Sequence, residues 1–187
     1  MTGRFRATAT PLAGLWLLER LPIGDDRGFF ERLYDAEELR ACGHPGVIVQ
    51  VNRSLTRRRG AVRGLHFQHP PHGEWKVITC LRGRVHDVVV DLRRGSPTFR
   101  RHHAVELADD ASRTLVVPPG CAHGFQTLSE DCELLYLHSH PQVPAAEGGV
   151  RSDDPGLAIT WPLAIAERSE RDGRHALLSV DYPGLAP

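Results

Sequence analysis

The sequence predicts an all-β protein, most simply a double-sheet jelly roll with a few short helices at its periphery. Two observations lead to this prediction. Eighteen Gly and 14 Pro residues interrupt the 187-residue chain at short intervals, and the segments between them are rich in Val, Ile, Leu and aromatic residues, which favour strands. These segments recur about every ten residues, a spacing typical of β-sandwiches and barrels.

Seven segments are expected to be strands, because each is an apolar or β-branched run bounded by turn residues. In chain order they are Val47–Val51, Val62–Gln68, Trp75–Cys80, Arg84–Leu92, His102–Leu107, Leu115–Val117 and Cys132–His138. Proline geometry fixes the path of the loops at Gly95–Thr98 and Pro118–Gly120.

Two segments are expected to be helical. Asp35–Ala41 opens with an acidic residue at a plausible helix N-terminus and ends before Gly43. Ala164–Glu170 carries a weaker pattern of the same kind. Since the sequence contains no long helix and no internal repeat, a single domain over residues 1–187 is expected.

The composition excludes several classes of protein. Hydrophobic residues make up 41% and charged residues 25% of the chain, as in a globular domain rather than a disordered one. The longest apolar runs, such as Val88–Val90, are too short to span a bilayer. Lys plus Arg and Asp plus Glu number 23 each, so the net charge of zero gives no reason to expect a nucleic-acid partner. We therefore expect neither a membrane nor a nucleic acid as partner.

The cysteines indicate a reducing compartment. The four cysteines are scattered without the paired spacing of a zinc site or a disulfide framework. Met1–Thr10 lacks the apolar segment of a signal peptide. A cytoplasmic protein with free thiols is expected.

One candidate strand carries a cation and a histidine together. Strict alternation in Val62–Gln68 would place His66 on the face of Gly64 and Arg63 on the opposite face. A glycine inside a strand often marks a bulge or a close approach of another backbone, and Gly64 can relax this alternation. Taken alone, a histidine on a strand is more often packed than functional.

A second histidine has a candidate partner. His123 lies where the Pro118–Gly120 loop enters a strand. Asp87 lies in the middle of the expected strand Arg84–Leu92, where an ionised carboxylate is costly unless it is paired. We expect His123 to be the group that pairs with Asp87.

The spacing of His66, His69 and His72 suggests a metal site, but the pattern argues against one. The two prolines between His69 and His72 rule out a helix, so the three side chains need not face one another. A His-x-His pair followed by Glu, a common pattern of metal ligands on a strand, is also missing around His66. No metal ligands are expected.

Eight segments in order resemble the dTDP-4-dehydrorhamnose 3,5-epimerase family of the cupin superfamily, over about residues 12–173. They are Asp25–Phe30, Val49–Asn52, Val62–Gln68, Val85–Arg93, Ser96–Phe99, Pro119–Phe125, Asp153–Pro155 with Trp161–Pro162, and Ser169–Asp172. The resemblance implies a cupin-type jelly roll and a homodimeric isomerase. It also implies a nucleotide-diphosphate-linked 4-keto-6-deoxyhexose as substrate, with no metal and no other cofactor.

The resemblance also implies a role for each of ten residues. His66 is similar to the family's catalytic base, Asp172 to the carboxylate that orients it, Lys76 to the lysine beside the C4 oxygen, and Tyr136 to the general acid. The remaining six resemble residues that line or support the substrate site: Arg63, Gln50 and Asn52 at the diphosphate and sugar, the pair His123 and Asp87, and Arg27, offered to the pocket by the same chain or by a partner subunit.

These residue types suit the chemistry. A positioned neutral imidazole can remove a proton α to a ketone, a carboxylate stabilises the imidazolium that forms, and an ammonium stabilises the resulting C4 enolate. Two departures from the family pattern are Gln142, where an aromatic residue is usual, and Arg32, where Glu is usual. They leave open whether C3, C5 or both are inverted. The alternatives are a 3,4-ketoisomerase of similar build and a non-catalytic cupin that binds sugar nucleotides.

Overall fold

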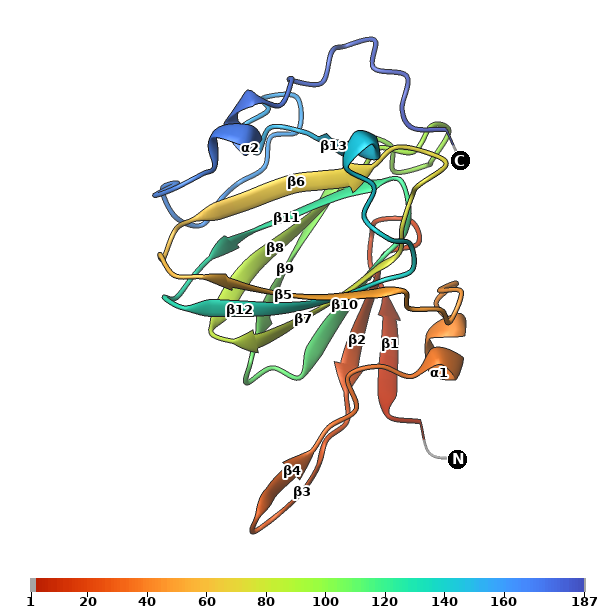
Figure 1. Ribbon diagram of the computed structural model, residues 1–187, viewed down its shortest axis with the longest axis vertical. Helices are drawn as coiled ribbons and strands as arrows, with labels where there is room; N and C mark the ends of the chain where they lie inside the picture. Colours follow the sequence, from red (N-terminus) through yellow and green to blue (C-terminus); the bar gives the residue numbers. More distant parts are fainter. Residues whose placement is uncertain (1–2, 187) are drawn as a thin grey trace.

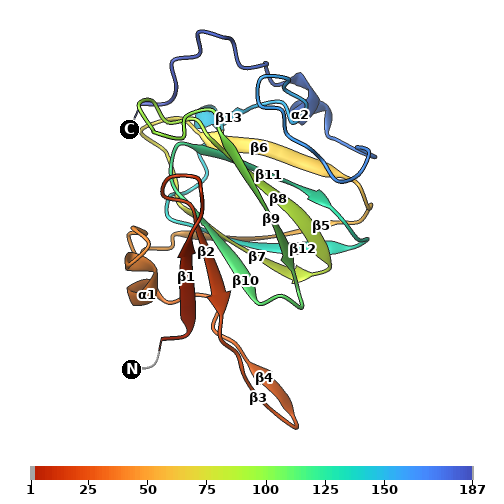
Figure 2. The ribbon, with the colours of Figure 1, turned by 180° about the vertical axis from the view of Figure 1, so that it is seen from behind.

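The computed structural model describes residues 3–186, and in this part of the chain two antiparallel sheets face each other as a jelly roll (Figures 1 and 2). One sheet has the order β1 (Phe5–Ala9), β2 (Trp16–Arg20), β10 (Arg113–Val117), β7 (Lys76–Arg82), β12 (Cys132–His138), β5 (Gln50–Thr56). The other has the order β13 (Glu147–Gly149), β6 (Val62–Gln68), β11 (Cys121–Thr127), β8 (Arg84–Asp91), β9 (His102–Ala108). The predicted fold class is confirmed.

A hairpin and short helices complete the described chain. The strands β3 (Ile23–Asp25) and β4 (Gly28–Phe30) pair with each other and extend away from the barrel (Figures 1 and 2). The helices are α1 (Ala36–Arg40), the 3₁₀ turn η1 (Pro144–Ala146) and α2 (Glu170–Arg174). None of the helices in residues 3–186 has both the length and the apolar character needed to cross a membrane.

The strand predictions differ from the structure in two ways. Val62–Gln68 and Cys132–His138 coincide with β6 and β12, but the strand expected at Val47–Val51 begins at Gln50 and continues to Thr56. The strands β1, β2 and β13 and the hairpin strands were not predicted, and β11 was anticipated only as the strand that the Pro118–Gly120 loop enters. The sequence of β11, CAHGFQT, is poor in β-branched residues, yet it is buried along its whole length between β6 and β8, so its tertiary position overrides its weak strand propensity.

One helix prediction is confirmed and the other is wrong. In α1, the Asp35 carboxylate caps the helix by accepting hydrogen bonds from the N–H groups of Glu37 and Glu38. The expected helix Ala164–Glu170 is extended instead, because Glu167 pairs with the chain entering β6: the Val62 N–H donates to its carbonyl at 2.9 Å. The helix begins only at Glu170, where the Ser169 hydroxyl supplies the N-cap.

Two apolar clusters position the elements of the pocket. Between the sheets, residues such as Ile78, Leu115 and Leu134 form a closed core, and Tyr136 packs at its border. On the outer face of the five-stranded sheet, a second cluster includes Leu157 and Trp161 from the C-terminal part of the chain. This packing holds the C-terminal segment, with α2, across β6 (Figure 1).

Buried His44 makes stability depend on pH. Its ring is 1% exposed and lies between Tyr34 and Trp75. Its Nδ1 accepts a hydrogen bond from the Gly46 N–H at 3.0 Å, so a proton bound there would break this bond. Burial lowers the pKa of His44 to about 4 from its ordinary 6.5. The unfolded chain therefore binds the proton more readily than the folded chain between these pH values.

We predict that the free energy of unfolding falls by up to about 3 kcal/mol as the pH decreases from 6.5 to 4, because protonation favours the unfolded state over this range. In His44→Asn, the amide oxygen can still accept from Gly46 but does not titrate, so this part of the pH dependence should disappear. Urea titrations of both proteins at a series of pH values measure it. An equal slope in the two proteins would contradict the prediction.

Candidate active site

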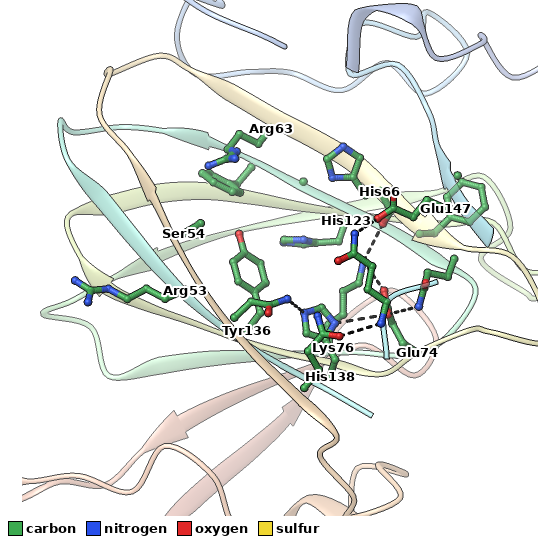
Figure 3. A pocket seen from close by; sticks show the side chains of 18 of the residues that line it. Arg53, Ser54, Arg63, His66, Glu74, Lys76, His123, Tyr136, His138 and Glu147 are labelled. Atoms are coloured by element: carbon green, nitrogen blue, oxygen red, sulfur yellow. Dashed lines mark hydrogen bonds and ion pairs between the residues drawn. The ribbon is translucent and has the colours of Figure 1, made fainter. Parts of the chain in front are cut away.

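A cavity of about 350 Å³ opens between the two sheets (Figure 3). The five-stranded sheet contributes Arg63 and His66 from β6 and His123 from β11, and the six-stranded sheet contributes Lys76 from β7 and Tyr136 from β12. Side chains from opposite walls therefore point into one space, as Figure 3 shows for Tyr136 and His66.

A bulge in β6 places Arg63 and His66 on the same face. His66 pairs with His123 of β11, and Arg63 pairs with Phe125, so three steps along β6 match two along β11. The extra residue reverses the alternation, and the prediction that Arg63 lies opposite His66 is wrong. Gly64 permits this arrangement: a Cβ there would lie 2.6 Å from the Cα of Gly124, and its φ of +115° strongly disfavours any other residue.

His66 and Asp172 form a hydrogen-bonded dyad. The Nε2 of His66 donates to Asp172 Oδ1 at 2.7 Å, and the Gly64 N–H donates to Oδ2 at 3.0 Å. Burial acts to raise the pKa of Asp172, but the hydrogen bonds from His66 and Gly64 outweigh it and lower the pKa to about 2. The ionised carboxylate fixes the proton on Nε2, which leaves the lone pair of Nδ1 free. The His66 side chain is 41% exposed and lines the cavity.

A second His–Asp pair includes His123, which lines the cavity, and Asp87, which does not. The Nε2 of His123 donates to the carboxylate of Asp87, 2.8 Å from Oδ2, and both side chains are buried. The predicted pairing of these two residues is confirmed. The rings of His123 and Tyr136 meet edge to face with centroids 6.1 Å apart, so the pair supports the position of Tyr136.

Tyr136 is held in its protonated form. Its side chain lies in the cavity on the wall opposite β6 (Figure 3). Burial raises the pKa of its hydroxyl well above the ordinary value of 10. The phenol therefore keeps its proton at neutral pH and can donate it.

Lys76 is a buried cation with a matching anion. Its Nζ donates to the carbonyl of His66 at 3.1 Å and lies 3.2 Å from Glu74 Oε1. Burial acts to raise the pKa of Glu74, but the hydrogen bond from His138 and the charge of Lys76 outweigh it, so the pKa falls. Glu74 was missed from the sequence. The sequence signal is that Glu74 lies two residues before Lys76, so both side chains fall on one face of an extended segment. A buried lysine needs a counter-charge, and Glu74 is placed to supply it.

The predicted binding residues divide between the pocket and the hairpin. Gln50, Asn52 and Arg63 line the cavity. Arg27 does not line it: in the turn between β3 and β4 its side chain is 89% exposed and pairs with Asp25 at 2.5 Å. Within one chain, the structure thus brings together nine of the ten predicted site residues and leaves Arg27 outside.

A basic groove of about 580 Å³ adjoins the cavity and shares Arg63, His66 and Arg171 with it. Three further arginines line this groove: Arg57, Arg58 and Arg168. From the sequence alone, the Arg57–Arg59 run is only a weak indication of an anion site, because such runs are usually solvated turns. Arg171, which precedes Asp172 in the chain, was also missed.

The suggested grouping of His66, His69 and His72 is absent. Within residues 3–186, the group of three ligating side chains whose ligand atoms lie within 4.8 Å of one another contains His66 but neither His69 nor His72. Instead, the His69 ring contacts Phe67 and the His72 ring contacts His140. The path of the two prolines separates these side chains, as expected.

The fold and the pocket define a class of protein: a jelly roll whose interior holds a histidine paired with a carboxylate, a tyrosine and a lysine, beside a groove lined by arginines. Residues 9–179 match the family model described as dTDP-4-dehydrorhamnose 3,5-epimerase. A dTDP-4-dehydrorhamnose 3,5-epimerase of Streptomyces griseus is 44% identical over 93% of this chain and 88% of its own length. The chain belongs to the dTDP-4-dehydrorhamnose 3,5-epimerase family.

Two solved structures extend the comparison. NovW, a 4-keto-6-deoxy sugar epimerase from the novobiocin gene cluster of Streptomyces spheroides, superposes with a TM-score of 0.88 at 38% identity, covering 95% of this chain and 89% of NovW. ChmJ, a 3'-monoepimerase from Streptomyces bikiniensis in complex with dTDP-quinovose, gives 0.83 at 36% identity, covering 89% and 84%. The family, the cupin-type fold and the isomerase class predicted from the sequence are confirmed, and the ketoisomerase alternative is not favoured.

Proposed function

We propose that this chain epimerises a dTDP-linked 4-keto-6-deoxyhexose by removing and returning a proton next to the C4 ketone. The observation that carries the proposal is the arrangement of the pocket. His66, the base of the dyad, and Tyr136 belong to opposite sheets and face one cavity, and Asp172 reaches His66 from α2. Inversion of a carbon needs a base on one side of the sugar ring and an acid on the other, and this arrangement supplies both.

His66 acts as the base in this proposal. The hydrogen bond to Asp172 keeps the proton on Nε2, so Nδ1 accepts the proton from the carbon α to the ketone. The imidazolium that results lies 2.7 Å from an ionised carboxylate, which stabilises it. The role of Asp172 is to orient and stabilise the ring.

Lys76 stabilises the enolate. When the carbon loses its proton, negative charge develops on the C4 oxygen, and a preorganised ammonium in a site shielded from water lowers the free energy of that state. Its contacts with Glu74 and the His66 carbonyl hold Nζ in place before the reaction. Tyr136 then returns a proton from the opposite wall.

The arginines bind the diphosphate of the substrate. Arg63 and Arg171 lie where the cavity meets the basic groove, and a guanidinium can donate two parallel hydrogen bonds to phosphate oxygens. Gln50 and Asn52 at the cavity mouth contact the diphosphate or the sugar. Every step of this reaction is a proton transfer, so we propose that it needs no metal and no redox cofactor.

A homodimer would explain why apolar side chains of the β3–β4 hairpin are exposed in the single chain. The side chains of Phe29 and Phe30 are 74% and 64% exposed in the single chain, and apolar surface of this kind marks an interaction site. We propose that a second copy covers the hairpin and that Arg27 thereby reaches the partner's pocket. The cysteines, all free and buried, are compatible with a reducing compartment, and we propose the cytoplasm.

His66→Asn is expected to abolish exchange of substrate hydrogens with the solvent. The amide cannot accept the proton, and loss of a general base costs about 10²- to 10⁴-fold in rate. The measurement is NMR of a dTDP-4-keto-6-deoxyglucose in heavy water, which reports deuterium entering at C3 and C5. Binding of dTDP should persist in this variant as its control. Exchange at the wild-type rate would overturn the role of His66.

Tyr136→Phe is expected to separate exchange from inversion. Deuterium should still enter at the carbon that His66 deprotonates, but inversion there should fail because no acid faces the opposite side.

In the wild-type protein, Gln142 replaces an aromatic residue that could hold a second pose of the sugar, so labelling at one of C3 and C5 should exceed labelling at the other by about tenfold or more. Equal labelling at both carbons would contradict the prediction that one carbon is favoured, and it would leave the epimerase proposal intact.

Analytical ultracentrifugation of the wild-type protein is expected to give the mass of a dimer. The double variant Phe29→Ser, Phe30→Ser should shift this to a monomer with an unchanged circular-dichroism spectrum. Arg27→Ala should stay dimeric while its affinity for dTDP falls about tenfold, or 1.4 kcal/mol. A monomeric wild-type protein would refute the dimer, and an unchanged dTDP affinity in Arg27→Ala would refute its place in the partner's pocket.

A further inference from the structure

His175 lies beside the His66–Asp172 dyad and has no part in the proposed reaction. It follows α2 directly, and its side chain is 15% exposed. Its Nε2 is buried, lies 4.0 Å from Asp172 Oδ1, and has no hydrogen-bond partner among the described residues. A buried imidazole nitrogen without a partner is energetically costly, so its position calls for an explanation.

The surrounding backbone accommodates the His175 ring. A Cβ on Gly149 would lie 2.3 Å from its Nε2, so the missing side chain at this point of β13 leaves room for the imidazole. Gly149 is paired with His66 across the sheet, and the rings of His66 and His175 are 6.0 Å apart. The glycine therefore allows a second imidazole to approach the first.

The three side chains offer a set of metal ligands. One ligand atom from each of His66, Asp172 and His175 lies within 4.8 Å of the other two. Imidazole and carboxylate are ligands that Zn²⁺ prefers, and bond lengths near 2.0–2.1 Å place tetrahedral donors about 3.3 Å from one another. The separation of 2.7 Å between His66 and Asp172 must widen, and the 4.0 Å between His175 and Asp172 must shorten. Each change is about 1.5 Å or less, within reach of side-chain rotations.

We propose that His66, Asp172 and His175 bind a divalent transition-metal ion such as Zn²⁺, and that the bound ion inhibits the enzyme. Three protein ligands leave a fourth position for water, and the partly exposed His66 keeps the site open to the cavity. The metal-binding part of the proposal depends only on these three side chains. The inhibitory part rests on the proposed function, in which His66 is the base.

Inhibition follows from the tautomer of His66. In the dyad, Nε2 carries the ring proton and donates it to Asp172. A metal ion on Nε2 needs that nitrogen's lone pair, so the neutral ring carries its proton on Nδ1 instead. Nδ1 is the atom that accepts the substrate proton, and its lone pair is then no longer available. The number of protons on the ring is unchanged, and only the site of the lone pair moves.

The test is a comparison of metal binding in the wild-type protein and in His175→Ala, with His72→Ala as a matched control. His72 also packs its ring against a second histidine, His140, but lies outside the three-ligand group. Titration calorimetry with Zn²⁺ and the visible absorption of bound Co²⁺ measure binding without any sugar. We expect one ion per chain in the wild-type and His72→Ala proteins, and an affinity at least about tenfold weaker in His175→Ala. The same loss in His175→Gln, which fills the space, would exclude a packing defect.

Activity assays test the inhibition separately. Zn²⁺ should inhibit exchange in the wild-type protein, a chelator should restore it, and His175→Ala should keep its uninhibited rate while resisting Zn²⁺. Equal metal affinity in the wild-type and His175→Ala proteins would overturn the site and leave the epimerase proposal standing. Metal binding that requires His175 in a protein without epimerase activity would support the site and refute the proposed function. Activity that a chelator destroys would overturn the inhibitory role.

Discussion

The site depends on the contact between the backbones of β6 and β11 at Gly64 and Gly124. No side chain fits between these strands, because a Cβ on either glycine would lie 2.6 Å from backbone of the other strand. This contact accommodates the extra residue of β6, which turns Arg63 and His66 to the same side. It also leaves the Gly64 N–H free of the ladder to donate to Asp172. One local irregularity thus sets the positions of Arg63, His66 and Asp172, the residues proposed to bind the anion, act as the base and orient that base.

The second constraint is electrostatic, because the pocket buries charges of both signs. Three of the ionised groups near its wall have close partners: Asp172 has His66, Asp87 has His123, and Lys76 has Glu74. Removing His66 or His123 would leave a buried carboxylate without its partner, and removing either Lys76 or Glu74 would leave the charge of the other unpaired, which costs more than the pair contributes. The pairs also fix tautomers and protonation states in advance, so the pocket needs little reorganisation when an enolate forms. A chain with zero net charge can therefore hold a locally polarised site.

The sequence predicts which residues form the site better than it predicts how they are arranged. The family resemblance implies the roles of the dyad, Lys76 and Tyr136, and β6 and β12 follow from their β-branched and apolar runs. The face of Arg63 does not follow, because a bulge depends on packing between two strands distant in sequence. The extended path of Ala164–Glu170 fails for the same reason: its pairing with the start of β6 outweighs its local helix propensity. His175 matches no motif, and only the fold shows that it approaches Asp172.

In the proposed reaction, the arrangement of the base His66, the acid Tyr136 and Lys76 limits how a second carbon can be inverted. C3 and C5 both neighbour the C4 ketone, so an ammonium held at the C4 oxygen can stabilise the enolate formed toward either carbon. Lys76 is fixed by Glu74 and the His66 carbonyl, and the base and acid belong to opposite sheets. The protein groups therefore cannot exchange places, and the sugar ring itself must turn about its C4 oxygen to present the other carbon. The side chains that line the pocket around the sugar would then determine which of these poses is favoured. One residue that lines the pocket is Gln142, whose amide donates to Glu147 and offers no aromatic face for the sugar ring to stack against.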